Sequence, residues 1–150
     1  MSNRYVTSKA ESEALLKAGL NPETADMVYI HGKYDQFNPK RRQRLVTSTV
    51  SPLDNFADQA AVLGDDHNLP AWSLAALLAV MPTYITMHGK EYRLAMRKYF
   101  DPEDVLNCYE FQYEDLQGNA PFGACFYHRQ PIQAACDMVY WLITHNHINR

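Results

Sequence analysis

The stretch of residues 69–82, which reads LPAWSLAALLAVMP, constrains the fold more than any other part of the chain. Its apolar residues recur at helical spacing, Asn68 suits an N-cap, and Pro70 and Pro82 are placed to begin and end a helix. A helix that is apolar on nearly every side is typically buried in a core or an oligomer. At roughly a dozen residues it is shorter than the about 20 that cross a bilayer. The sequence predicts a buried helix over residues 70–81.

After Pro82 the apolar rhythm changes from the period of a helix to the period of a strand. Residues 84–88 and 91–99 predict two strands joined by a turn at His88, Gly89 and Lys90. Residues 107–114 alternate strictly, with three aromatic residues on one face. A turn at residues 117–118 leads into a strand in which Phe122, Ala124 and Phe126 alternate.

Antiparallel pairing of these strands gives the sheet one aromatic face and one polar face. On the polar face, Arg93 and Arg97 are expected opposite Glu110 and Glu114, as a solvated pattern of charges. With the turn centred on residues 117–118, Cys108 is expected to face Tyr127, and Cys125 to face Glu110.

Helices are expected before and after this sheet. Ser8 and Glu11 have the spacing of a capping box for a helix that ends at Gly19. Further helices are expected over residues 21–29 and 51–64, and residues 45–50 suit either a strand or a loop. A regular apolar stripe predicts a C-terminal helix over residues 131–145 that covers the aromatic face of the sheet.

Strands that cluster in the sequence between helices indicate the α+β class. The expected fold is one α+β domain over residues 1–150, since single domains most often have about 100–150 residues. Its small antiparallel sheet has three to four strands over about residues 84–128. N-terminal helices, the buried helix 70–81 and the C-terminal helix 131–145 pack on it.

Charge and cysteine usage exclude several classes of protein. A formal net charge of −3 argues against a chain that binds nucleic acid or a membrane over its whole surface. No apolar run follows Met1, so neither a signal peptide nor a membrane span is expected. Cys108, Cys125 and Cys136 lack metal-site spacing and are odd in number, which is typical of reduced thiols. We expect a cytoplasmic protein with no membrane partner.

The motif Leu69-Pro-Ala-Trp-Ser-Leu-x-x-Leu-Leu-x-x-Met-Pro82, the tyrosine-rich sheet and residues 134–143 together resemble a known group of proteins. These are small uncharacterised proteins carried by bacterial phages and integrated mobile elements. The resemblance covers about residues 69–148 and extends to parts of residues 16–27. It implies a shared fold and a mobile-element origin. No catalytic or binding residues come with it.

Several residues suit chemistry, yet none has the full pattern that a reaction needs. His145 and His147 lack the further ligands of a zinc site, and a solvated C-terminus is favoured. Asp65, Asp66 and His67 suit a general base, but an acidic loop before a helix explains them as well. No Cys–His spacing marks a nucleophile, so the thiols are interpreted as packed and inert. We therefore predict no catalytic residue, no metal, no cofactor and no small-molecule ligand.

A dense basic segment stands out against the acidic remainder of the chain. It has four cations in five residues, with two aromatic residues just upstream. Such a segment can bind the phosphates of a nucleic acid while the aromatic rings stack on its bases. The interpretation as a solvated loop or a protein-contact patch is favoured over nucleic-acid binding. The residues are Tyr34, Phe37, Lys40, Arg41, Arg42 and Arg44.

Two functions remain. The first is a small cytosolic interaction or accessory protein that is not an enzyme and that associates with itself or with a protein partner. Abundant tyrosine and tryptophan, residue types enriched at interfaces, favour it. The alternative is a nucleic-acid-binding accessory protein that uses residues 40–44. An enzyme acting through Asp65, Asp66 and His67 is a distant third.

Overall fold

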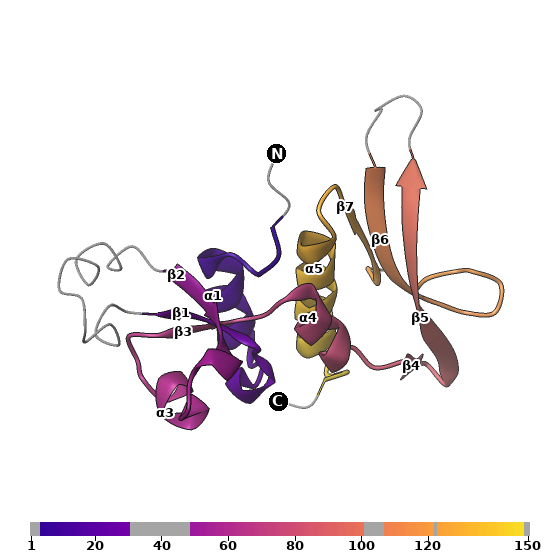
Figure 1. Ribbon diagram of the computed structural model, residues 1–150. Coiled ribbons are helices and arrows are strands. Elements are labelled where there is room, and N and C mark those ends of the chain that lie inside the picture. Colours follow the sequence, from indigo (N-terminus) through magenta and orange to yellow (C-terminus); the bar gives the residue numbers. More distant parts are fainter. Residues whose placement is uncertain (1–3, 31–48, 101–106, 122, 149–150) are drawn as a thin grey trace.

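The computed structural model describes residues 4–30, 49–100, 107–121 and 123–148 of the chain. Two antiparallel sheets stand apart with helices between them (Figure 1). In chain order the elements are α1 (Lys9–Ala18), a 3₁₀ turn (Pro22–Thr24), β1 (Met27–Ile30), β2 (Thr49–Pro52), a second 3₁₀ turn (Leu53–Asn55), α3 (Gln59–Leu63), β3 (Leu69–Ala71), α4 (Leu74–Val80), β4 (Tyr84–Met87), β5 (Lys90–Phe100), β6 (Asn107–Glu114), β7 (Cys125–His128) and α5 (Pro131–Thr144). The class is α+β, as expected.

The N-terminal helix α1 begins and ends at the predicted residues. The Ser8 hydroxyl accepts the Glu11 N–H at 3.1 Å, and the Glu11 carboxylate accepts the Ser8 N–H at 3.1 Å. Gly19 ends the helix at φ 110°, a left-handed conformation that a glycine adopts without steric strain. Both ends of this helix are therefore encoded locally.

A three-stranded sheet of order β2-β1-β3 replaces two of the expected helices. The helix expected over residues 21–29 is wrong, because only the 3₁₀ turn forms and β1 follows it. The helix expected over residues 51–64 is reduced to α3, because its first two residues belong to β2. Strand pairing with residues distant in sequence overrides the local pattern here. Of the segment 45–50, residues 49–50 lie in β2 and residues 45–48 lie outside the described ranges.

The buried central helix is shorter than predicted and begins four residues later, at Leu74. Pro70 lies in β3 opposite Val28, at the edge of the sheet, where a proline is tolerated. The true N-cap is Ser73, whose hydroxyl accepts the Ala76 N–H at 3.2 Å. The Asp26 carboxylate fixes this cap by accepting the Ser73 N–H at 2.8 Å. Asn68, the expected cap, instead donates to the Val62 carbonyl at 3.0 Å.

The four-stranded sheet has the order β4-β5-β6-β7 and confirms the antiparallel sheet predicted within residues 84–128. Its last strand is shorter than expected, because β7 begins at Cys125, after Ala124, and Phe122 lies outside the described residues. Its register places Arg93 opposite Glu114 and Arg97 opposite Glu110, as expected. The Arg97 guanidinium lies 2.6 Å from Glu114 and 3.4 Å from Glu110. One face of the sheet therefore carries charges that neutralise one another.

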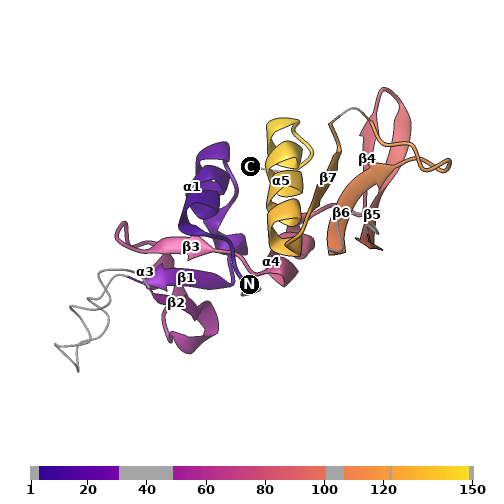
Figure 2. The same ribbon diagram turned by 90° about the horizontal axis from the view of Figure 1, so that it is seen from above.

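The helix α5 lies between the two halves of the molecule. Figure 2 shows α1 on one side of it and the four-stranded sheet on the other, and α5 contacts α1, α4, β6 and β7. Nine of its fourteen residues are buried, so both flanks of the helix contribute to the core. The aromatic face of the sheet packs against it through Phe111 and Tyr113, which are both buried.

Candidate interaction groove

A groove opens between α4, the inner face of β5 and β6, and the first turn of α5. It consists of two adjoining cavities of about 440 Å³ and 300 Å³, which share Leu74, Tyr109 and Pro131. Leu78, Met96 and Phe111 line the smaller cavity. Most of these side chains are apolar, and volumes of this order suit side chains of a partner or a small ligand.

The groove exists because the helix that covers the sheet is shorter than the strands. The fourteen residues of α5 span about 21 Å, whereas the eleven of β5 span about 36 Å. The β5–β6 hairpin therefore projects beyond α5 (Figure 1). Met96 and Phe100 lie on the inner face of the projecting part and remain 57% and 65% exposed.

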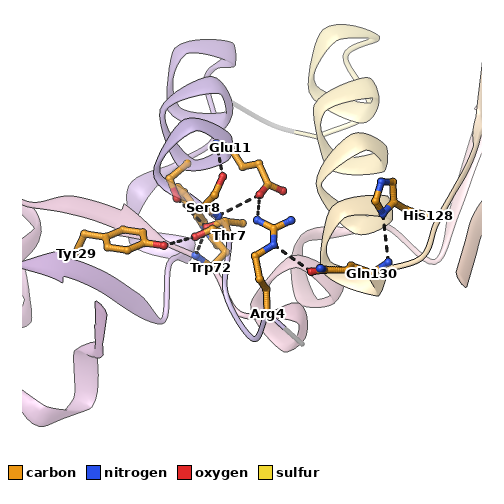
Figure 3. Close-up of polar contacts among 9 residues, drawn as sticks. Arg4, Thr7, Ser8, Glu11, Tyr29, Trp72, His128 and Gln130 are labelled. Atoms are coloured by element: carbon orange, nitrogen blue, oxygen red, sulfur yellow. Dashed lines mark hydrogen bonds and ion pairs between the residues drawn. The ribbon is translucent and has the colours of Figure 1, made fainter. Parts of the chain in front are cut away.

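A polar network forms the wall at the α5 end of the groove (Figure 3). Arg4 donates from Nε to the Gln130 amide oxygen at 3.1 Å and forms an ion pair with Glu11. The Gln130 N–H donates to His128 Nδ1 at 3.2 Å. Because Gln130 directly precedes α5 and Glu11 belongs to α1, Arg4 connects the two helices at this wall.

The electrostatics of this wall keep its groups in their ordinary charge states. Burial raises the pKa of Glu11, but hydrogen bonds from Arg4 and Ser8 outweigh it and hold the pKa below its usual value. Burial, together with the neighbouring Glu11 carboxylate, raises the pKa of the Cys136 thiol. The carboxylate is therefore charged and the thiol protonated at neutral pH, so the wall is structural rather than reactive.

A further cavity, of about 550 Å³, lies at the other end of the sheet between the β4–β5 and β6–β7 connections. Its charged groups are engaged with one another. Asp115 accepts from the Lys90 ammonium at 2.6 Å and from the Gln117 and Asn119 N–H groups at 2.9 Å each. The hydrogen bond from the Lys90 ammonium, followed by those from the backbone N–H groups, lowers the pKa of Asp115. This carboxylate organises the turn, and we do not assign it a ligand.

The structure describes some of the candidate residues that the sequence singled out, and others lie outside the described ranges. Tyr34, Phe37, Lys40, Arg41, Arg42 and Arg44 lie outside the described residues. The rings of His145 and His147 stack on Trp141, with centroids 4.3 Å and 5.4 Å away. The Asp65 carboxylate accepts the His67 N–H at 2.9 Å within the loop before β3. Within the described ranges, no three His, Cys, Asp or Glu side chains are grouped to hold a metal ion.

The cysteines lie in a register different from the one expected. Glu110 pairs with Tyr127, and Cys125 pairs with Gln112 rather than with Glu110. The prediction that Cys108 faces Tyr127 is likewise wrong. Between the turn and β7, the chain contains extra residues that pair with no residue of β6, and they shift the register. Burial, followed by the charge of Glu110, raises the pKa of the Cys125 thiol. Neither this thiol nor Cys136 is activated as a nucleophile.

The sequence does not predict the groove. It places Leu74 and Leu78 in the buried helix and Met96 on the covered face of the sheet. The available signal was the mismatch between the expected lengths of the strands and of the C-terminal helix.

Comparison of the chain with protein-family models, with curated proteins and with solved structures found no match. None of the helices in the described ranges has both the length and the apolar character required to cross a membrane.

Proposed function

We propose that the chain is a small, non-enzymatic interaction protein that binds a partner protein in the groove between α4 and the β5–β6 hairpin. The observation that carries this proposal is the uncovered apolar side of the hairpin. Met96 is exposed and lines a preformed cavity together with Leu74 and Leu78 of α4, and Phe100 is exposed further along the same face of β5. Large apolar and aromatic side chains that converge on a concave surface are characteristic of protein interfaces.

The same proposal includes a cytoplasmic location and a phage or mobile-element origin. The three cysteines are free thiols, as a reducing compartment allows. The resemblance of residues 69–148 to mobile-element proteins supports the origin. Self-association is the alternative to a foreign partner, and measurement of molecular mass in solution distinguishes the two.

Met96→Glu is expected to weaken partner binding, because it places a charge against the apolar groove. The wild-type chain and the variant are immobilised, and an extract of the producing cells is passed over each. The captured protein is then purified, and its affinity is measured directly with both forms. We expect the affinity to fall at least about tenfold, since one central interface residue contributes about 1.4 kcal/mol or more.

Tyr127→Ser is the matched control. Tyr127 is 68% exposed and lies opposite Glu110, on the face of the sheet away from the groove. This variant is expected to bind as the wild type does. Equal binding by the wild type and by Met96→Glu would contradict the proposed function.

The basic segment supports a second candidate, a nucleic-acid-binding accessory protein. The sequence observation that favours it is the four cations Lys40, Arg41, Arg42 and Arg44 downstream of two aromatic residues. If all four bind phosphates, affinity for DNA or RNA falls about a hundredfold between 50 mM and 200 mM salt. Replacing all four with serine is expected to abolish the gel shift. A shift that these substitutions leave unchanged would exclude this segment as the binding site.

A further inference from the structure

Among the described residues, the second half of β5 has one backbone edge that pairs with no neighbouring strand. On one side, β4 pairs with residues 90–93, and on the other, β6 pairs with residues 93–100. The Leu94 N–H donates to the Thr83 carbonyl at 2.9 Å, which shows that even-numbered residues direct their backbone groups toward the β4 side. Because these directions alternate, Met96, Lys98 and Phe100 present their N–H and carbonyl groups to the same side. No described residue pairs with them there.

The side chains of these three residues project on the inner face of the sheet, since Met96 lies directly opposite Phe111. They form an alternating apolar, cationic, apolar row beside the groove. Lys98 makes no ion pair with any described residue, and its ammonium lies 5.5 Å from the centre of the Tyr109 ring. By contrast, Arg97 on the outer face is engaged by Glu110 and Glu114.

We propose that the partner binds as an added β-strand along residues 95–100 of β5. It would carry an acidic side chain opposite Lys98, between two apolar side chains opposite Met96 and Phe100. Strand addition satisfies the free backbone groups, while alternate side chains enter the neighbouring pocket and determine specificity. The cavity of about 300 Å³ that Leu74, Leu78 and Met96 line is placed to receive those side chains.

The charges on the edge disfavour a second copy of the chain as the added strand. Antiparallel pairing that uses every free group of residues 96–100 places Lys98 opposite Lys98. A shift by one step toward residue 94 places Arg97 opposite Arg97, and a further shift that way competes with the bond between Leu94 and Thr83. A shift the other way leaves only residues 98–100 of β5 paired with one another. Like charges directly opposite destabilise a strand pair, and charged edge residues block association of identical edges. A carboxylate in a foreign strand removes this penalty.

This inference rests on the proposed function, and it is tested with the full chain and a designed peptide. The peptide is a short capped strand of alternating threonines, with valine, glutamate and valine at the positions facing the groove. On titration, NMR signals of residues 95–100 are expected to shift. Replacing the glutamate with lysine is expected to weaken binding about fivefold to tenfold, because attraction to Lys98 becomes repulsion. N-methylation of the peptide's pairing amides is expected to abolish binding.

The protein variant Lys98→Glu is expected to reverse the preference and bind the lysine peptide more tightly. Arg93→Glu is the matched control, because Arg93 is an exposed cation of the same strand on the outer face. Equal binding of the two peptides, unchanged binding after N-methylation, or no shift on β5 would overturn strand addition. If the peptide does not bind while Met96→Glu still weakens binding of the natural partner, strand addition is wrong and the groove remains the proposed binding site. If Met96→Glu leaves partner binding unchanged, the proposed function itself fails.

Discussion

Trp72→Ala is expected to lower the free energy of unfolding by about 3–5 kcal/mol, a large part of the 5–15 kcal/mol typical of a domain. The Trp72 side chain is fully buried, and its indole N–H donates to the Thr24 hydroxyl at 3.0 Å. Its backbone N–H donates to the Thr7 hydroxyl at 3.0 Å, and its carbonyl accepts the Thr7 N–H at 2.9 Å. Truncation leaves a cavity where β3, the N-terminal segment and the 3₁₀ turn meet.

Urea unfolding measures this loss, with Trp141, the other of the two tryptophans, as the fluorescent reporter. Trp72→Phe is the control, since it keeps most of the buried ring and removes the hydrogen bond to Thr24. It is expected to lose about half as much stability as the alanine variant. A loss below about 1 kcal/mol for Trp72→Ala would show that Trp72 does not join these elements.

The elements that the sequence predicts correctly are those whose signals are local. Ser8, Glu11 and Gly19 fix both ends of α1 by hydrogen bonds within the first and last turns. The strict alternation of residues 107–114 and the stripe of residues 131–143 identify β6 and α5, because each pattern fits only one period. The faces to which the β5 and β6 side chains point follow from the need to place aromatic residues on one side of the sheet, and the opposite charges of Arg93 and Arg97 and of Glu110 and Glu114 favour the register.

The elements that the sequence does not predict correctly depend on pairing partners that are distant in the chain. β1 and β3 are strands because each pairs with the other, and Val28 lies opposite Pro70 although they are forty-two positions apart. Pro70 fits the first turn of a helix and the edge of a sheet equally well, so its local preference cannot decide. The cap at Ser73 likewise depends on Asp26, which lies forty-seven positions away. Local N-cap, proline and periodicity signals predict a helix for both segments.

The candidate site is less predictable than the fold, because it depends on which part of the sheet the helices leave exposed. An apolar residue on a predicted strand is assigned to the core, and the sequence gives no reason to treat Met96 differently. Met96 is 57% exposed because the hairpin projects beyond the first turn of α5. Only the relative placement of α4, α5 and β5 shows that this apolar face borders a groove and a free strand edge.

Amide hydrogen exchange of the free protein tests the central claim, that β5 offers an unoccupied edge for a partner strand. Ala95 and Arg97 are paired to β6, so their N–H groups are expected to be protected. Met96 and Lys98 direct theirs to the open side and are expected to exchange at least about a hundredfold faster, the factor given by an opening free energy of about 3 kcal/mol. Addition of the glutamate peptide is expected to protect them. Equal protection of all four N–H groups in the free protein would contradict the claim.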